Sequence, residues 1–348
     1  MQALTTLPGR PGSATVAETP APTLPAGGVP IRVLEVGVCG TDREIVAGEF
    51  GTAPPGDETL ILGHELLGEV AADGHGFDKG DLVSATVRRS CERCAPCLEG
   101  SPDACATGDY AERGITALHG FAAEAVVEWP EHIVAVPRAL GRLGVLAEPA
   151  SICARGLRHA LTVGARQPWE ARRALVIGAG AIGMLAAYML RLANREVVVA
   201  ARSATDSEKA ALAAAAGAEY LSTAETRLED TGAFDLVIEA AGSAELMVAG
   251  ASLLRRNGVV CLLGLDAHAH PVTIDGTLLG VDFVIENRVL LGSVNAHRRD
   301  WDAGVRDLVA MRERWPDALE RLIGLRVAPD GFPEAFAFRG VKATLQFV

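Results

Sequence analysis

The sequence predicts a two-domain α/β protein in which a mostly-β domain is joined to a doubly wound parallel sheet. Its 348 residues exceed one hydrophobic core, because domains average about 150 residues. Residues 1–150 are rich in Gly, Pro and short β-branched runs, which indicate strands joined by irregular loops. From about Ala171, apolar runs alternate with helical spacing, and this order builds a parallel sheet with helices on both faces.

Short apolar runs predict the individual strands. In the first region they fall at residues 31–38, 66–71, 82–87 and 121–127. In the second they fall at 174–177, 196–200, 235–238, 259–263 and 289–294, with helices expected at 181–193, 207–216 and 243–254. A helix near 299–315 and short strands follow, and we expect them to rejoin the first domain because they are too few to bury a core alone. The predicted domains are therefore 1–151 with 298–348, and 152–297.

The composition is that of a globular protein with an acidic surface. Apolar residues make up 49% and charged residues 22%, which argues against disorder. The net charge of −12 is unlike that of proteins that bind nucleic acid or anionic membranes. A single Arg or a helix N-terminus still suffices to bind a phosphate. Since no uncharged apolar run reaches about 18 residues and no signal pattern opens the chain, we expect a cytoplasmic protein without a transmembrane helix.

A glycine-rich turn, Gly178-Ala-Gly180-Ala181-Ile182-Gly183, follows a predicted strand and opens a predicted helix. In such a turn the first glycine permits the tight bend, and the second lets the backbone approach a pyrophosphate. The third allows close packing of helix on strand, and the helix N-terminus offers N–H donors to the anion. In this βαβ context the motif predicts a dinucleotide site, and a turn with no ligand is the alternative.

The end of the second strand of this sheet indicates which dinucleotide binds. An NAD site usually places an acid about 20 residues after the glycines, where it bonds the ribose hydroxyls. Here that stretch reads Ala201-Arg202-Ser203, with no carboxylate. Arg202 is suited to pair with a 2′-phosphate, so NADP is favoured over NAD. The alternative is an Arg that only faces solvent at a strand end.

Four of the seven cysteines crowd together as Cys91-x-x-Cys94-x-x-Cys97-x7-Cys105. This spacing wraps a short loop around one ion, and four thiolates complete a tetrahedral zinc site. Such a site has no open position and is structural. Disulfides among neighbours so close in sequence are the weaker alternative.

A second set of metal-ligating side chains is spread along the first region: Cys39 in Cys-Gly-Thr-Asp, His64 in Gly-His-Glu, and Glu148 in Ala-Glu-Pro. Cys, His and carboxylate ligands with one open position are the set of a catalytic zinc. Each residue also has an ordinary interpretation, as a buried thiol, a core histidine or an acid at a helix start. Their spacing alone does not unite them.

Taken in order, these motifs resemble the zinc-dependent medium-chain alcohol dehydrogenases over essentially the whole chain. The shared motifs are Cys39-Gly-Thr-Asp42, Gly63-His-Glu-x-x-Gly68, Gly80-Asp81, the four cysteines and the glycine loop. Within that superfamily, further segments are similar to the glucose 1-dehydrogenases. These are residues 39–45, 87–89, 112–115, 118–121, 286–287 and 291–295.

The resemblance implies a GroES-like catalytic domain and a Rossmann domain that binds NADP. It implies one catalytic and one structural zinc per chain, and association into a homodimer or homotetramer. The implied ligands of the catalytic zinc are Cys39, His64, Glu65 and Glu148, of which the two glutamates exchange with water or substrate. Glu112 and Asn295 are implied to face the sugar or the nicotinamide. Because residues 64 and 65 are sequential, both can bind one ion only if the backbone kinks there.

Three positions depart from the pattern of some sugar-binding relatives. Val87, Ile152 and Ile285 stand where those relatives carry polar residues that bond sugar hydroxyls. A site built to bond hydroxyls discriminates strongly among substrates, and an apolar site does so weakly. The departures concern the identity of the sugar and leave the zinc and NADP chemistry untouched.

The implied reaction is oxidation of a sugar hydroxyl with hydride transfer to NADP, which converts D-glucose or a related aldose at C1 to the lactone. Zinc would lower the pKa of the hydroxyl. Thr41 would relay its proton outward, with Glu65 or Glu148 as base. The alternatives are the same chemistry on a polyol, a cyclitol or a secondary alcohol, a zinc-free enone or quinone reductase, and a non-enzymatic NADP-binding protein. The intact zinc ligands argue against the zinc-free reductase and the non-enzymatic protein.

Overall fold

A computed structural model describes residues 1–265 and 270–347. The chain forms two compact units. The β-rich unit comprises residues 1–151, 295–309 and 323 onward, and the α/β unit comprises residues 152–294 and 310–322. The domain limits predicted from the sequence, 1–151 with 298–348 and 152–297, stay a prediction.

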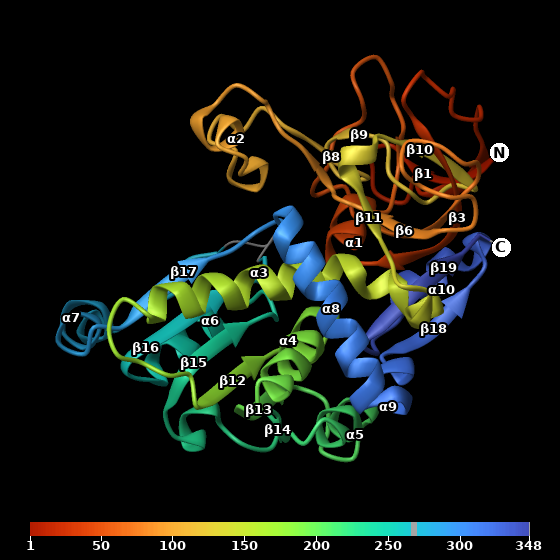
Figure 1. Ribbon diagram of the computed structural model, residues 1–348. Helices are drawn as coiled ribbons and strands as arrows, with labels where there is room; N and C mark the ends of the chain where they lie inside the picture. The colour runs from red at the N-terminus through yellow and green to blue at the C-terminus, as the bar shows by residue number, and fades with distance from the viewer. Residues whose placement is uncertain (266–269, 348) are drawn as a thin grey trace. The chain divides into compact units, whose positions relative to one another are not determined.

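Among the described residues, the β-rich unit contains three sheets (Figure 1). The largest has seven strands in the order β11-β6-β5-β3-β19-β18, with β10 also paired to β3. These strands are β3 (Val29–Val38), β5 (Glu65–Val70), β6 (Leu82–Ala85), β10 (Ala125–Glu128), β11 (Ile133–Ala135), β18 (Ile323–Val327) and β19 (Lys342–Gln346). The two small sheets are built from β1 (Gln2–Thr6), β2 (Thr15–Glu18) and β4 (Leu60–Ile61), and from β7 (Arg88–Arg89), β8 (Ala111–Arg113) and β9 (Ala117–Leu118).

Strand β3 is the centre of the large sheet and is buried along most of its length. Strand β5 pairs antiparallel on one side, with Gly37 opposite Glu65. Strand β19, close to the C-terminus, pairs antiparallel on the other side, with Ala343 opposite Val38. The last segment of the chain therefore packs against the strand that leads to the Cys39 motif.

The α/β unit contains a parallel sheet in the order β14-β13-β12-β15-β16-β17. Its strands are β12 (Arg173–Ile177), β13 (Glu196–Ala201), β14 (Glu219–Ser222), β15 (Phe234–Glu239), β16 (Leu254–Leu262) and β17 (Val289–Gly292). The chain winds outward in both directions from β12. Right-handed crossovers therefore place α4 (Ala181–Leu192) and α5 (Glu208–Ala215) on one face and α6 (Ala244–Ser252) on the other. The doubly wound sheet predicted from the sequence is confirmed.

The strands of this sheet are apolar because helices cover both faces. Leu175, Val198, Phe234, Val237 and Val260 are buried in one cluster. Burial of each such side chain stabilises the fold by about 1.5–3 kcal/mol. Rigid strands of this kind fix the loops that follow their carboxyl ends, where the glycine turn lies.

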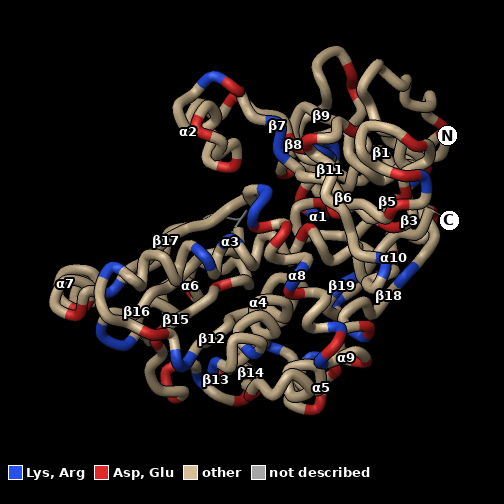
Figure 2. The backbone as a smooth tube through the Cα atoms, viewed as in Figure 1, with Lys and Arg blue, Asp and Glu red and all other residues tan. Residues whose placement is uncertain are grey.

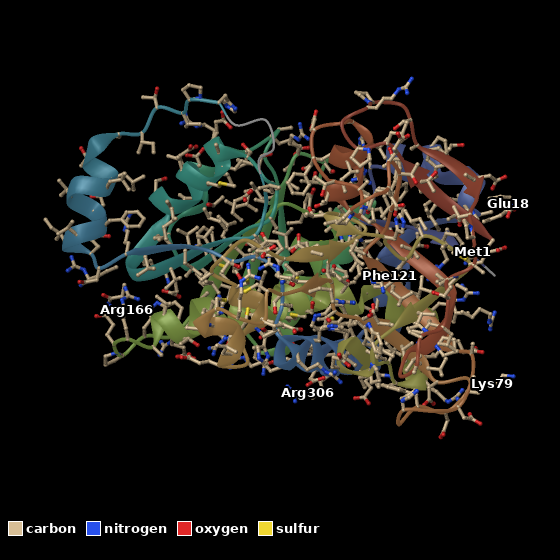
Figure 3. All side chains as sticks on the ribbon, turned by 90° about the horizontal axis from the view of Figure 1, so that it is seen from above. Met1, Glu18, Lys79, Phe121, Arg166 and Arg306 are labelled. Carbon is tan, nitrogen blue, oxygen red and sulfur yellow. The ribbon has the colours of Figure 1, made fainter. Side chains whose placement is uncertain are left out.

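The remaining helices are α1 (Gly40–Val46), α2 (Ala95–Leu98), α3 (Ala147–Gly164), α7 (Phe283–Ile285), α8 (Arg298–Arg314), α9 (Pro316–Arg321) and α10 (Phe332–Ala337). None of the helices in the described part of the chain has the length and apolar character needed to cross a membrane. Acidic and basic segments are interspersed along the backbone of each unit (Figure 2). The amino terminus of Met1 lies 3.2 Å from Glu18 and closes the β1–β2 pair (Figure 3).

The structure differs from the predicted elements in several places. Strand β10 begins at Ala125 instead of Phe121, because the N–H groups of Phe121 and Ala122 bond the carbonyls of the 62–63 loop. Helix α6 ends at Ser252, so Leu254 starts a strand instead of ending a helix. Among the elements that were not predicted are helix α3, which mixes polar and apolar residues, and strand β14, which lies on an edge of the sheet and carries polar residues.

Candidate functional site

Cys39, His64 and Glu65 come together in the β-rich unit. The metal-ligating atoms of these three side chains all lie within 4.8 Å of one another. Cys39 stands at the N-terminus of α1 and is partly exposed, whereas His64 is 4% and Glu65 is 1% exposed. Two separate segments of the chain thus converge on one small volume.

A bend before β5 lets the neighbouring residues 64 and 65 face the same place. Gly63 has a φ of +86°, which residues with a side chain rarely adopt, and a Cβ there would lie 2.7 Å from Val36. His64 precedes the strand and Glu65 begins it. Because the alternation of side chains in β5 starts only at Glu65, His64 can face the same side as Glu65, which is the kink that two sequential ligands need.

Lys342 holds the carboxylate of Glu65. Its Nζ lies 2.7 Å from both Oε1 and Oε2 of Glu65, and it also donates to the carbonyl of Val38. Since β3 lies between β5 and β19, the Glu65 side chain crosses β3 at Gly37, where a Cβ would overlap Oε2. Burial alone would lower the pKa of Lys342, but the charges of Glu65 and Cys39 raise it above its ordinary value. Lys342 is therefore a cation at neutral pH.

Asp42 holds two of the candidate ligands in place. One carboxylate oxygen lies 3.5 Å from Nδ1 of His64, and the other accepts the backbone N–H of Cys39 at 2.8 Å. Burial alone would lower the pKa of His64, but the charge of Asp42 raises it well above its ordinary value. With Nδ1 facing Asp42, Nε2 is the nitrogen left to bind a metal.

Glu148 lies at the start of α3 and is 6% exposed. Burial raises its pKa to about 7, while the charge of His64 lowers it and that of Glu65 raises it. Glu148 therefore interacts electrostatically with the cluster, although its carboxylate is not among the ligand atoms that lie within 4.8 Å of one another in the described part of the chain. Thr41 is half-buried in the first turn of α1, two residues after Cys39.

These side chains fit a zinc ion. A thiolate, an imidazole and a carboxylate are ligands that zinc prefers in proteins. The pKa of Glu148 tests the fit: a buried carboxyl with a pKa near 7 is costly to ionise, and a divalent cation beside it would offset that cost. Cys39 and His64 would hold the ion, with Glu65 and Glu148 as the carboxylates within reach, and the contact with Lys342 competes with a metal for Glu65.

The four cysteines also converge, in a segment that contains α2. The Sγ atoms of Cys91, Cys94, Cys97 and Cys105 lie within 4.8 Å of one another. All seven cysteines are free, and Sγ of Cys94 is 3.3 Å from Cys97 and 4.0 Å from Cys105, so the disulfide alternative is wrong. The hydroxyl of Thr107 lowers the pKa of Cys105 to about 5, which makes a thiolate available at neutral pH. The segment fits a tetrahedral zinc.

Glu112 and Asn295, expected to face the sugar or the nicotinamide, are each fixed by a neighbour. Nε and Nη2 of Arg88 both lie 3.0 Å from one oxygen of Glu112. Asn295 has a φ of +65°, and its Oδ1 accepts the N–H of Ala296 at 2.8 Å. Its Nδ2 is buried and has no hydrogen-bond partner in the described part of the chain. An unpaired buried donor costs about 1–3 kcal/mol, which a ligand oxygen at this position would recover.

The glycine turn has the shape that a dinucleotide requires. Gly178 has a φ of +106°, and a Cβ there would lie 2.8 Å from the backbone of Ala240. At Gly183 a Cβ would overlap the carbonyl of Gly178, so the third glycine brings helix and strand together. At Gly180, by contrast, a Cβ would meet nothing within 4 Å. Open space thus remains at the N-terminus of α4, whose first residues are Ala181 and Ile182.

Arg202 follows the last residue of β13, Ala201, and is exposed. The hydroxyl of Tyr220 donates to the carbonyl of Ser203 at 3.1 Å and fixes the turn beyond it. Within the ranges 1–265 and 270–347, the guanidinium of Arg202 forms no ion pair or hydrogen bond. An exposed cation beside a fixed turn is suited to a phosphate.

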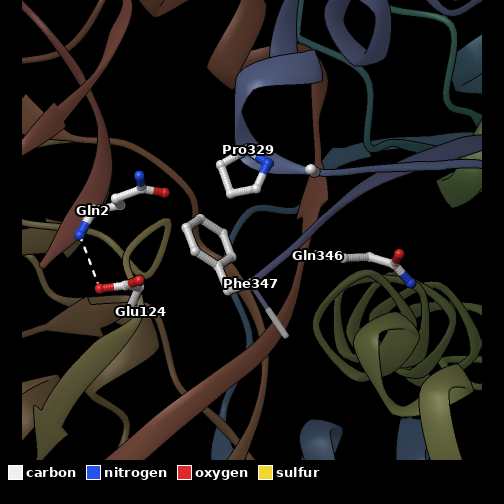
Figure 4. A pocket seen from close by; sticks show the side chains of 6 residues that line it. Gln2, Glu124, Pro329, Gln346 and Phe347 are labelled. Atoms are coloured by element: carbon white, nitrogen blue, oxygen red, sulfur yellow. Dashed lines mark hydrogen bonds between the residues drawn. The ribbon is translucent and has the colours of Figure 1, made fainter.

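Two surface hollows do not involve the candidate ligands. One of about 300 Å³ is lined by Gln2, Glu124, Ala328, Pro329, Gln346 and Phe347, and the N–H of Gln2 donates to Glu124 there (Figure 4). Another of about 380 Å³ lies along β14 and includes Tyr220 and Asp230. Neither is lined by a residue of the two clusters.

Two family models together match most of the chain. The alcohol dehydrogenase GroES-like domain matches residues 25–138, and the glucose dehydrogenase C-terminus matches residues 141–347. The fold and these matches define the class as the zinc-dependent medium-chain dehydrogenases, with a GroES-like domain and a Rossmann domain.

Two relatives define the family within this class. The chain is 41% identical to the glucose 1-dehydrogenase of Methanocella arvoryzae, over 96% of this chain and 95% of the relative. It is 40% identical to glucose 1-dehydrogenase 1 of Caldivirga maquilingensis, over 97% and 96%. The chain therefore belongs to the glucose dehydrogenase family. The fold also matches Haloferax mediterranei glucose dehydrogenase, solved with NADP, Zn and gluconolactone, with a TM-score of 0.92 at 29% identity over 100% of this chain and 99% of that one.

No role for Asp42, Arg88 or Lys342 was predicted from the sequence. Asp42 carried a usable signal, since an acid three residues after Cys39 at a helix start is the pattern of a cap. Arg88 lies in a segment similar to the glucose 1-dehydrogenases, but no spacing linked it to Glu112. Lys342 carried no signal, because its partner Glu65 is 277 positions away.

Proposed function

We propose that this chain oxidises an aldose, D-glucose or a close relative, at C1 to the lactone and transfers the hydride to NADP. The observation that carries the proposal is the convergence of Cys39, His64 and Glu65, with Glu148 nearby, in a chain 41% identical to a glucose 1-dehydrogenase. Gluconolactone in the Haloferax structure is the product that oxidation of glucose at C1 yields.

In this proposal, different side chains of the β-rich unit bind the metal, orient its ligands and transfer the proton. When bound, zinc supplies a Lewis acid that lowers the pKa of an alcohol. Asp42 fixes the ring of His64, and Lys342 holds Glu65, so the ligands are oriented in advance. Thr41 passes on the proton of the substrate hydroxyl, and whichever of Glu65 and Glu148 is not bound to the metal is the base that receives it.

The two fixed polar side chains supply recognition in this proposal. Glu112, held by Arg88 through one carboxylate oxygen, offers its second oxygen to a hydroxyl. Asn295 offers its buried amide N–H to an oxygen of the sugar or of the nicotinamide. Both groups would be left unpaired by an analogue that lacks the matching polar atom, which is the basis of strong discrimination.

A substrate panel with zinc-loaded protein tests the proposal. NADPH formation is followed with aldoses, polyols, cyclitols and secondary alcohols, and the zinc content is measured alongside. We expect the highest kcat/KM with an aldose. A preference for a polyol, a cyclitol or a secondary alcohol would keep the dehydrogenase class and overturn the sugar assignment. Zinc and NADP binding without turnover of any substrate would point to a non-enzymatic protein.

Replacement of Arg202 with alanine is expected to raise the KM for NADP about 30-fold, since hydrogen bonds to a charged group contribute about 1.5–3 kcal/mol. The KM for NAD should stay unchanged, because NAD lacks the 2′-phosphate. Steady-state kinetics with both cofactors measure the change. Arg227→Ala, which removes an exposed arginine of the same unit, is the control. An equal effect of Arg202→Ala on both cofactors would contradict the role.

We also propose that the chain forms a homodimer through β17. This strand is an edge of the six-stranded sheet, and its Leu290 is 47% exposed. Val284 and Ile285 of nearby α7 are 69% and 61% exposed. An exposed apolar edge strand pairs readily with a second copy. Leu290→Arg is expected to give a monomer in light scattering, and the exposed change Leu24→Arg should leave the mass unaltered.

We assign the enzyme to the cytoplasm. All seven cysteines are free, and five of them bind metal as thiolates in this proposal. A reducing compartment keeps thiolates available for zinc. Incubation with oxidised glutathione should therefore release zinc from the purified protein.

A further inference from the structure

The cysteine lobe, residues 91–105, is bound to the rest of the β-rich unit through two of its backbone carbonyls. The carbonyl of Gly100 accepts a hydrogen bond from Nε2 of His297 at 2.7 Å. The carbonyl of Asp103 accepts one from Nη1 of Arg88 at 3.0 Å. Both carbonyls lie between the third and fourth cysteines. Zinc binding by those cysteines therefore fixes both carbonyls at once.

The first connection leads from the lobe to Glu112. Arg88 is only 9% exposed, and its guanidinium lies 3.8 Å from the centre of the Tyr110 ring. A guanidinium is planar, and its N–H groups point in fixed directions. Once Nη1 is bonded to Asp103, the directions of Nε and Nη2 toward Glu112 are set. The position of the Glu112 carboxylate thus depends on the lobe.

The second connection leads from the lobe to Asn295. While Nε2 of His297 donates to Gly100, Nδ1 accepts the N–H of Arg299 at 3.0 Å. In this pairing Nε2 is the donor and Nδ1 the acceptor of the ring. The N–H of His297 is itself bonded to Asp300. Because the ring is held at both nitrogens, the turn that begins at Asn295 is fixed relative to the lobe.

We propose that the cysteine lobe positions the two polar side chains that face the substrate and cofactor, and that His297 and Arg88 are the positioning residues. Zinc in the lobe orders Gly100 and Asp103, which hold the His297 ring and the Arg88 guanidinium. The role of Asn295 in binding rests on the proposed function, whereas the link between lobe and turn does not. Removal of one such hydrogen bond changes affinity about fivefold.

His297→Phe tests the second connection, because the ring stays but both nitrogens are lost. We expect faster amide hydrogen exchange at residues 293–300 and a KM for NADP about fivefold higher, with kcat altered less than about twofold and both zinc ions retained. His297→Gln keeps an N–H donor and should restore both values. Arg298→Gln is the matched control, since Arg298 bonds Ile133 and not the lobe. Equal effects of the Phe and Gln variants, or of Arg298→Gln, would overturn the proposal.

Cys105→Ser tests the lobe itself. Loss of the lobe zinc is expected to speed hydrogen exchange at residues 110–114 and 293–300 and to leave residues 36–42 unchanged. Unchanged exchange at both of the first segments would overturn the proposal. If Cys105→Ser does not fold, the hydrogen exchange of His297→Phe, which keeps all four cysteines, decides whether the proposal holds. Exchange needs no substrate, so an absence of dehydrogenase activity would count against the proposed function alone.

Discussion

Cys39→Ser is expected to abolish NADPH formation and to lower the zinc content by one ion per chain. Cys39 supplies the only thiolate in the described cluster with His64 and Glu65, and a serine hydroxyl remains protonated at neutral pH and binds zinc poorly. Without the ion, nothing lowers the pKa of the substrate hydroxyl, so kcat should fall about a thousandfold or more. Zinc analysis and steady-state kinetics on the same preparation measure both effects.

Two other cysteine variants separate this outcome from general damage. Cys94→Ser should also lose one zinc ion, but from the four-cysteine site. It should keep the ion in the site that contains His64. Cys153→Ser, at a buried cysteine in the α/β unit, should keep both ions. Competition with a chelator distinguishes the two sites, because a site with four thiolates releases zinc more slowly than one with an open position. An active Cys39→Ser enzyme with full zinc would refute the assignment of the catalytic site.

The parallel sheet could be predicted because its signals are local. Residues 174–177 form one apolar run, the glycines follow at once, and helical spacing begins at Ile182, so a window of about 20 residues contains the unit. Strand β14, by contrast, carries Glu219 and Tyr220 on an edge of the sheet, where burial is incomplete and no apolar run is required. Edge position explains why that strand was missed.

The metal ligands could be named from motifs, but their surroundings could not. The bend at Gly63 depends on Val36 of a neighbouring strand, and the ion pair of Glu65 depends on a gap at Gly37 and on Lys342. Each of these contacts joins residues that only the folded sheet brings together. Residue types and local spacing carry no record of such pairing.

Lys342→Met is expected to lower the free energy of unfolding of the zinc-free protein by about 3–5 kcal/mol, because it leaves the buried carboxylate of Glu65 without a cation. Urea unfolding in the presence of a chelator measures the loss. Lys342→Arg should lose less, since the charge remains. The double variant Lys342→Met/Glu65→Gln should recover most of the stability, because the buried charge is gone. Equal stability of Lys342→Met and the wild type would contradict the ion pair.

The same variant also shows what Lys342 does for the metal. With zinc bound, Glu65 released from Lys342 has a second cation within reach, since its carboxylate lies within 4.8 Å of the ligand atoms of Cys39 and His64. The loss of stability in Lys342→Met should therefore be smaller with zinc than without it, and the visible spectrum of a cobalt-substituted variant should report an added oxygen ligand. If zinc leaves the loss unchanged and the cobalt spectrum matches that of the wild type, Glu65 takes no part in binding the ion, and Lys342 serves stability alone. A changed spectrum would mean that the wild-type lysine keeps a coordination position open for the substrate by withholding Glu65.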